Sequence, residues 1–233
     1  VFTADPRLVP TARKLEEVSF EEMLELAAHG SRVLMARSVE FGRRFGIPLH
    51  VRSSFHDRPG TWVKETAMEQ AIISGVAHDT SEAKMTVTGV SDRPGVAALL
   101  FRTLADAEVN VDMIVQNVSA AGQTDISFTL PHDQIGAAEA AVGTVLPQLD
   151  AEGVTTDGDI ARVSLIGAGM QTNPGVAATM FETLSGADIN IEMISTSAIR
   201  ISCVVREAQA ESAVAALHAA FQLDRAPEDR ADV

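Results

Sequence analysis

The loop at residues 92–95 combines residue types that suit a small zwitterion. Asp92, Pro94 and Gly95 come directly before an apolar run with helical spacing. The unpaired N–H groups at the start of a helix lie at the positive end of its dipole, so they favour a carboxylate. Glycine allows close approach because it has no Cβ, and Asp92 would attract an ammonium group. The loop therefore predicts a binding site for a zwitterionic ligand.

Further polar residues follow this loop. The candidate site also includes Val96, Ala97, Gln116, Asn117, Thr124 and Asp125. In a simpler interpretation, Pro-Gly only makes a strand-to-helix turn, and for a single Pro-Gly pair that interpretation would be preferred. Duplication of the whole segment favours a binding site.

The duplication is visible at a fixed spacing. RPGVAALLFRTLADAEVNVDMI (93–114) aligns with NPGVAATMFETLSGADINIEMI (173–194) at an offset of 80 residues. This period is too long for most solenoid repeats, so each copy is expected to be a small domain. In the second copy Thr172 replaces Asp92, which removes the partner for an ammonium group. We expect this copy to supply an opposing wall, with Asn190 and Ile191 approaching a ligand held by the first.

Both copies predict the same order of elements. Strand-like runs at 84–90 and 161–167 precede the loop, and a helix and two strand-like segments follow it. Second helices are expected at about 133–149 and 207–221. This order predicts an α+β fold with two ferredoxin-like βαββαβ domains, each an antiparallel sheet with two helices on one face. The free face and open edges predict association into a homodimer.

Composition and charge exclude several classes of protein. The net charge of -14 argues against a nucleic-acid partner. No apolar stretch approaches the ~18 to 20 residues of a membrane span, and the N-terminus VFTADPR does not resemble a signal peptide. The single Cys203 and the lack of a Cys/His cluster argue against disulfides and a metal site. We therefore expect a cytoplasmic protein without membrane or nucleic-acid partners.

The repeats resemble ACT domains, the amino-acid-binding modules of biosynthetic enzymes. SDRPGVAA, NVDMIVQNVS, VSLIGAGM and NIEMISTS are similar to the regulatory region of lysine- and threonine-controlled, α2β2-type aspartate kinases. The resemblance covers about 75–221 and implies threonine, lysine or both as effector, with pairing of ACT domains. It also implies that a leading strand at 73–78 can complete the second ACT domain. The expected domains are 71–150 and 160–221, followed by a disordered tail at 222–233.

Residues 1–64 resemble the C-terminal end of an amino-acid-kinase domain. In that family two segments approach the nucleotide, and the matching residues here are Asp5, Arg7, Arg32 and Val33. Arg32 stands where the family usually has Lys. The Gly-rich phosphate-binding part of the kinase fold is absent from this sequence, so we expect no catalytic residue and no cofactor in this chain. ATP and Mg belong to the complete kinase.

Local signals within this segment predict a helix. Ser19 and Glu22 have the spacing of a capping box, and Gly30 is suited to end the helix that follows. The run IPLHVRSSF reads as a strand.

Three functional hypotheses remain open. The chain is the effector-binding part of an aspartate kinase that works with a kinase catalytic subunit, a free-standing ACT sensor for another enzyme, or part of an active kinase. The kinase-like segment 1–64 argues against a free-standing sensor.

Overall fold

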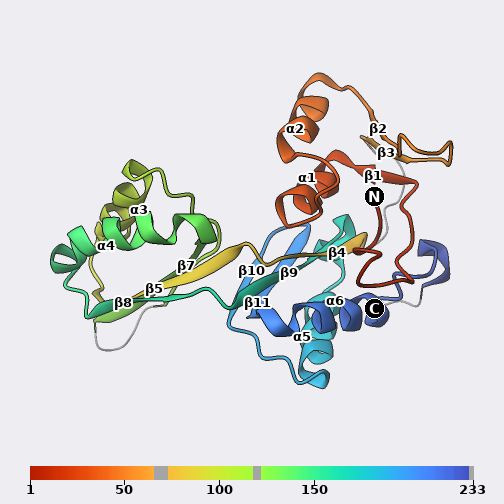
Figure 1. The fold of residues 1–233 in the computed structure, drawn as a ribbon. Helices are drawn as coiled ribbons and strands as arrows, with labels where there is room; N and C mark the ends of the chain where they lie inside the picture. Colours follow the sequence, from red (N-terminus) through yellow and green to blue (C-terminus); the bar gives the residue numbers. More distant parts are fainter. Residues whose placement is uncertain (66–72, 118–121, 231–233) are drawn as a thin grey trace. The chain divides into compact units, whose positions relative to one another are not determined.

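The chain folds into two compact units (Figure 1). The computed structural model describes residues 1–65, 73–117 and 122–230. One unit is Thr80–Ala161, and the other combines Val1–Asp79 with Arg162–Val233. Among the described residues, no helix is both long and apolar enough to cross a membrane.

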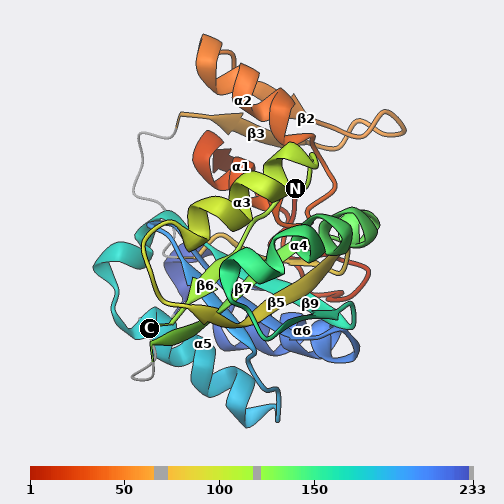
Figure 2. The same ribbon diagram turned by 90° about the vertical axis from the view of Figure 1, so that its left-hand side faces the viewer.

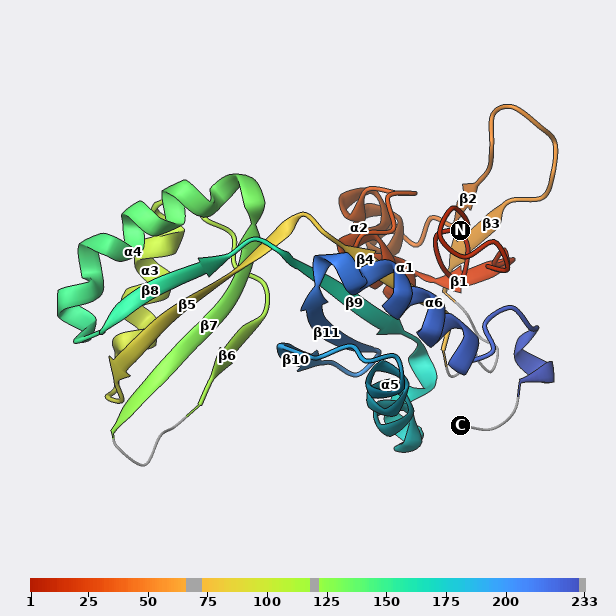
Figure 3. The same cartoon turned by 60° about the horizontal axis from the view of Figure 1, so that its bottom comes forward.

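The unit Thr80–Ala161 contains the first repeat. Its elements are β5 (Glu82–Ser91), α3 (Val96–Asp106), β6 (Ile114–Gln116), β7 (Gln123–Pro131), α4 (Ile135–Leu149) and β8 (Gly153–Asp157). The strands lie in the order β6-β7-β5-β8, and all neighbouring pairs are antiparallel. α3 and α4 lie on the same face of this sheet (Figure 3). The predicted α+β class and βαββαβ order are confirmed.

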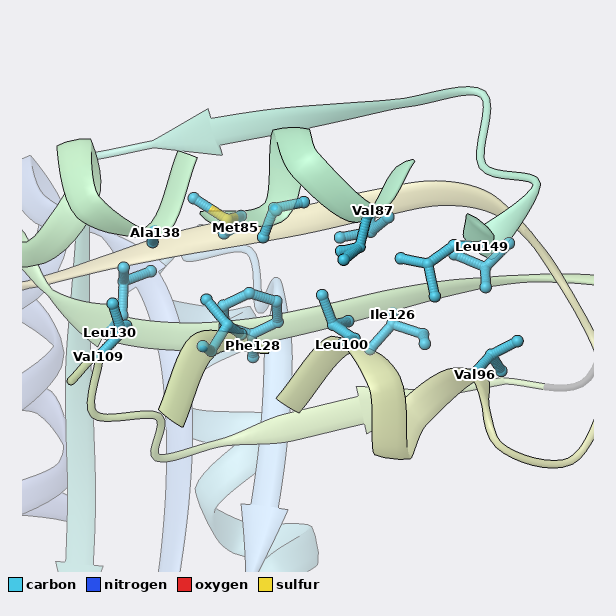
Figure 4. Close-up of a cluster of buried hydrophobic side chains, with 14 of the residues drawn as sticks. Met85, Val87, Val96, Leu100, Val109, Ile126, Phe128, Leu130, Ala138 and Leu149 are labelled. Atoms are coloured by element: carbon cyan, nitrogen blue, oxygen red, sulfur yellow. The ribbon is translucent and has the colours of Figure 1, made fainter. Parts of the chain in front are cut away.

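The core of this unit lies between the sheet and its two helices (Figure 4). Along β5, Met85 and Val87 are buried while Thr86 between them is half-buried, as expected for a strand with one face turned to the core. The helices contribute Val96, Leu100, Leu104, Ala138, Val142 and Leu149 to the same buried cluster. This packing holds α3, and therefore the loop before it, on the sheet.

The second repeat takes one strand from a distant part of the chain. Its elements are β9 (Ile160–Ile166), α5 (Gly175–Gly186), β10 (Met193–Thr196), β11 (Arg200–Arg206) and α6 (Ala210–Ala220). The strand order is β10-β11-β9-β4, and β4 (Gly75–Asp79) precedes the first repeat in sequence. β4 pairs with β9 in the same antiparallel manner as β8 pairs with β5. Residues 75–79 therefore have the role that the family resemblance implied for 73–78.

The N-terminal segment forms a small sheet and two helices (Figure 2). Its elements are β1 (Glu17–Ser19), α1 (Phe20–Ala28), α2 (Ala36–Phe45), β2 (Leu49–Val51) and β3 (Thr61–Lys64), with strand order β1-β3-β2. The capping box is present: Glu22 N donates to Ser19 Oγ (3.1 Å), and Ser19 N donates to Glu22 Oε2 (3.2 Å). Gly30 follows the last turn of α1 with φ +106°, as expected for the residue that ends a helix.

The second face of the β10-β11-β9-β4 sheet is covered by α1. We expected this face to be free, and for this repeat the expectation was wrong. Arg162 Nη2 of β9 donates to Ala28 O of α1 (3.3 Å), and Arg200 Nε of β11 lies 3.1 Å from Glu25 Oε2. Apolar residues of the sheet and of α1 share one buried cluster: Ala77, Ile166, Phe20 and Met23. The N-terminal segment supplies this cover because its amphipathic helix has an apolar face to bury.

The segment after Phe221 is attached to this unit instead of being disordered. Leu223 is fully buried and its N–H donates to His218 O (3.0 Å). Arg230 Nη1 donates to Ile73 O (2.6 Å). The expected disorder was therefore wrong for residues 222–230, because one buried leucine and one charge-assisted hydrogen bond fix a segment that looks polar in sequence. Residues 231–233 lie outside the described part of the chain.

Candidate functional site

The residues predicted for the first repeat gather at one end of its sheet. β5 ends where β7 begins, with Val90 opposite Thr124 and Ser91 opposite Gln123. Asp92 N donates to Gly122 O (2.9 Å), so the loop after β5 lies against the start of β7. Gln116 is the last residue of β6 and pairs with Ile126, two residues further along β7. Strand register therefore places Asp92, Gln116, Asn117 and Thr124 at this end.

Gly95 begins α3 in a conformation that suits glycine. Its φ is +99°, and a Cβ built there would have no heavy atom within 4 Å, so the space beside it is open. Pro94 is exposed and Ala97 is half-buried, whereas Val96 is buried in the core below. The first turn of α3 contains no acidic residue. The start of this 11-residue helix therefore offers N–H groups and a positive dipole end to an anion.

Arg93 lies beside the candidate site, and its contacts were not predicted from the sequence. Its Nη2 donates to Gln148 O (2.8 Å) and lies 3.5 Å from Asp150 Oδ2, at the C-terminal end of α4. A cation is favourable there because the carbonyl groups carry the negative end of the helix dipole. In the described part of the chain, Asp92 takes part in no ion pair, and it is exposed. The basic neighbour is thus turned away and the negative charge of Asp92 remains available.

Asp125 and Thr124 have structural roles in this region. Gly89 N donates to Asp125 Oδ1 (2.9 Å) at the irregularity of β5 between Val87 and Val90. This hydrogen bond satisfies a backbone donor that the shifted register leaves without a strand partner. Thr124 is buried, and its hydroxyl donates to Asn117 O. Both side chains shape the end of the sheet through these bonds.

The corresponding loop of the second repeat is closed by its own polar groups. Asn173 Nδ2 donates to Gly169 O (2.8 Å), and the Thr172 hydroxyl donates to the same carbonyl (3.2 Å). Asn190, which is exposed, and Ile191, which is half-buried, lie between α5 and β10 in this unit and not in the unit of Asp92. Thr172 provides no charge in place of Asp92.

The residues matched to the kinase nucleotide site lie in the N-terminal segment. Arg7 Nη2 forms an ion pair with Asp5 Oδ2 (2.6 Å), and the hydrogen bonds from Arg7 lower the pKa of Asp5. Arg32 and Val33 are exposed in the connection between α1 and α2. In the described residues no group of three or more His, Cys, Asp or Glu side chains is arranged to hold a metal ion.

Comparison with known families identifies the class of protein. The ACT domain family matches residues 85–146 and 163–221, and the amino acid kinase family matches residues 1–53. The chain therefore belongs to the ACT-domain family. The matched ranges begin inside the first strand of each repeat, β5 and β9, and end inside or just after its second helix.

Within that family, the similarity is to aspartate kinases along almost the whole chain. The aspartokinase of Mycolicibacterium smegmatis is 52% identical over 229 residues, which cover 96% of this chain and 54% of the relative. The regulatory subunit of aspartate kinase from Thermus thermophilus, in its ligand-free form, is 38% identical with a TM-score of 0.62, covering 64% of this chain and 99% of that one. Aspartokinase III of E. coli in complex with lysine and aspartate is 27% identical with a TM-score of 0.73, covering 94% and 49%.

These similarities confirm the resemblance drawn from the motifs. The chain corresponds to the regulatory ACT portion of aspartate kinases, preceded by the end of an amino-acid-kinase domain. It spans about half the length of the curated relatives it matches.

Proposed function

We propose that the chain senses threonine, lysine or both, and that the bound amino acid controls the phosphorylation of aspartate by ATP in a complete aspartate kinase. The effector is held in the first repeat, at the loop between β5 and α3. The E. coli relative with bound lysine supports an amino-acid effector for this class. A free-standing sensor is disfavoured because residues 1–53 match the amino acid kinase family.

The observation that carries this proposal is the separation of charges around Gly95. The positive start of α3 and the carboxylate of Asp92 belong to one short loop, and Arg93 is held away at the end of α4. An amino acid brings a carboxylate for the first and an ammonium group for the second. A simple anion would be repelled by the carboxylate of Asp92, and a simple cation would be repelled by the positive start of α3.

Thermal unfolding with added amino acids tests the site. A ligand that binds only the folded chain at ~100 times its Kd stabilises it by about 2.7 kcal/mol, which raises Tm measurably. Asp92→Asn keeps the side-chain shape and removes the charge, so we expect it to abolish most of this shift. The ligand-free Tm should change little because Asp92 is exposed.

Thr172→Ala is the matched control in the second repeat and should leave the ligand shift in place. If it abolishes the shift while Asp92→Asn does not, the effector is bound by the other repeat. If neither threonine nor lysine, alone or together, shifts Tm of the wild type, the assignment of the effector is wrong.

Edge strands support a homodimer through the ACT domains. β6 and β10 each lie at one edge of their sheet, and each has an exposed isoleucine, Ile114 (51%) and Ile194 (44%), at matched positions of the repeat. Exposed apolar edges favour pairing with another strand. Light scattering should give about twice the chain mass of 24.7 kDa. Ile114→Lys and Ile194→Lys should shift the mass toward the monomer, whereas Ala140→Lys on the exposed face of α4 should not.

Exposed apolar side chains in the N-terminal segment favour a partner that supplies the rest of a kinase domain, either in the same chain or as a catalytic subunit. In the described part of the chain, the exposed large apolar side chains other than Ile114 and Ile194 all lie in this segment: Phe2, Val33, Met35, Phe41, Phe45, Ile47, Phe55 and Trp62. The gathering of these exposed apolar side chains in one segment favours an interface there. Arg32 takes part in no ion pair among the described residues, so its guanidinium is available to a nucleotide phosphate.

In the complete enzyme, which we place in the cytoplasm, ATP and Mg would be held mainly by that partner. We expect the 233-residue chain alone to form no acyl phosphate from ATP and aspartate. Turnover clearly above background in a coupled assay of the purified chain would contradict this division of roles.

A further inference from the structure

The carboxylate of Glu22 joins α1 to the loop of the second repeat. Glu22 is only 3% exposed. Its Oε2 accepts hydrogen bonds from Ser19 Oγ (2.7 Å) and Ser19 N (3.2 Å), which fix the start of α1. Its Oε1 accepts hydrogen bonds from Ser74 Oγ, just before β4, and from Ala168 N (3.3 Å), the first residue after Gly167 in the loop. The capping box requires only the first oxygen, so the second is available for a long-range contact.

α1 is also attached to the second repeat further along its length. Glu25, one turn after Glu22, pairs with Arg200, and Ala28 O at the end of the helix accepts from Arg162. Gly30 then lies so close to β4 that a Cβ would be 1.8 Å from His78 O. Contacts at the start, middle and end of α1 therefore tie its position to that of this sheet and loop.

α1 leads directly to the residues matched to the nucleotide site. Ser31 N donates to Leu26 O (2.9 Å), which closes the helix, and Arg32 and Val33 follow. A displacement of α1 therefore displaces the segment that carries Arg32. The loop at Ala168, the helix and this segment form one continuous chain of contacts within a single unit.

We propose that Glu22 is a positioning residue that couples the loop after β9 to the kinase-like segment, so that a change in this loop shifts α1 and Arg32. The inference rests on the proposed function, because it describes how an ACT repeat would influence a kinase domain. One carboxylate serves two structural elements, so neither element can move without weakening the hydrogen bonds of the other.

Two substitutions remove the same hydrogen bond from opposite sides. Glu22→Gln retains one carbonyl oxygen, which can keep the capping box with Ser19, and then presents its amide NH2 toward Ser74 Oγ and Ala168 N. The Ser74 hydroxyl can accept a hydrogen bond from this amide. The backbone N–H of Ala168 is itself a donor, so its hydrogen bond to residue 22 is lost. Ala168→Pro removes the N–H itself, at the first position of a short 3-10 helix, Ala168–Thr172, where proline is tolerated.

Hydrogen exchange of the full chain measures the coupling without any ligand. We expect each single variant to accelerate exchange of the amides between Phe20 and Ser31 about fivefold or more, and the double variant to add nothing further. Glu21→Gln is the matched control, because Glu21 is the exposed neighbour of Glu22 in the same turn, and among the described residues its ion-pair partner is Arg43 at the surface. It should exchange like the wild type.

The proposal is overturned if Ala168→Pro leaves exchange in α1 unchanged, or if the effects of the two substitutions multiply in the double variant. Circular dichroism first checks that each variant folds. If one variant does not fold, the exchange rates of α1 in the other variant are compared with those in Glu21→Gln, and this comparison tests the proposal. The outcome is independent of the proposed effector. If the exchange data show the coupling but neither threonine nor lysine raises Tm, only the effector assignment is wrong. If an amino acid raises Tm but the exchange data show no coupling, only the role of Glu22 is wrong.

Discussion

His218 is a titratable side chain that the fold removes from water. It is 2% exposed, and its Nε2 lies 2.9 Å from Thr3 Oγ1, so it joins α6 to the start of the chain. Burial lowers the pKa of His218, Asp224 raises it and Arg230 lowers it, with burial the largest effect. The folded state therefore binds a proton less readily than the unfolded state.

This difference predicts a dependence of stability on pH. The contribution of His218 is fully present above the unfolded pKa of ~6.5 and is lost as pH falls below it, by at most about 1.4 kcal/mol per pH unit. The free energy of unfolding, measured with urea between pH 5 and 7.5, should fall on the acid side. His218→Gln should flatten that slope, whereas His56→Gln in an exposed loop should leave it unchanged. Equal slopes in all three proteins would contradict this account.

Gly30 must be glycine because its backbone lies very close to that of β4. Its φ is +106°, and a Cβ would overlap His78 O of β4. Gly30→Ala should therefore destabilise the chain by more than about 2 kcal/mol, because both the backbone conformation and the contact with β4 are lost. Gly46→Ala is the control. The φ of Gly46 is +63°, but a Cβ there would have no heavy atom within 4 Å, so the free energy of unfolding should fall by only about 1 kcal/mol. Comparable losses in the two variants would refute the role of the contact.

At the scale of the elements, both repeats end their helices in the same way. Glu108 after α3 and Asp188 after α5 have φ of 58° and 57°, and Asp150 after α4 and Gln222 after α6 also have positive φ. A left-handed residue at this position lets the chain leave the helix, and glycine is the usual choice. Each of these side chains therefore carries a small conformational cost.

Replacing Glu108 or Asp188 by glycine should relieve this cost. We expect each variant to be stabilised by about 0.5 to 1 kcal/mol, seen as a higher Tm. Ala140→Gly within α4 should be destabilised by a similar amount, because glycine lowers the stability of a helix interior. A lower Tm for both Glu108→Gly and Asp188→Gly would mean that their side chains stabilise the turns by contacts of their own.

At the scale of the whole molecule, the two repeats differ in how their sheets are completed. The first repeat is contiguous and includes its own fourth strand, β8. The second depends on β4, which is separated from it by the entire first repeat. Its sheet is also covered by α1, so this unit requires both ends of the chain.

This topology predicts that residues 80–158 fold alone and that 159–233 do not. The first fragment retains a complete βαββαβ core, whereas the second lacks an edge strand and its apolar cover. Circular dichroism and cooperative urea unfolding of the separate fragments should distinguish them. Adding residues 1–79 to the second fragment should restore folding. A cooperative transition for 159–233 alone would show that β4 is dispensable.

The sequence determined the features that depend on neighbouring residues or on the repeat. Apolar spacing and the 80-residue duplication predicted the strands and helices that the two repeats share, and the capping residues Ser19 and Glu22 predicted the start of α1. α2 was not predicted, because only Val39 and Gly42 of this helix are buried and its exposed Phe41 and Phe45 obscure the amphipathic pattern. Such signals act over a few residues, so they are visible without the fold.

Only the tertiary structure decided what each polar group contacts. Arg93 could have neutralised Asp92 beside it, but it lies against α4, 55 residues away at Gln148. Glu22 was expected only to cap its own helix, yet its second oxygen reaches Ala168, 146 residues later. No local pattern specifies these partners, because buried donors and acceptors must pair with whatever the packing of distant elements brings within about 3 Å.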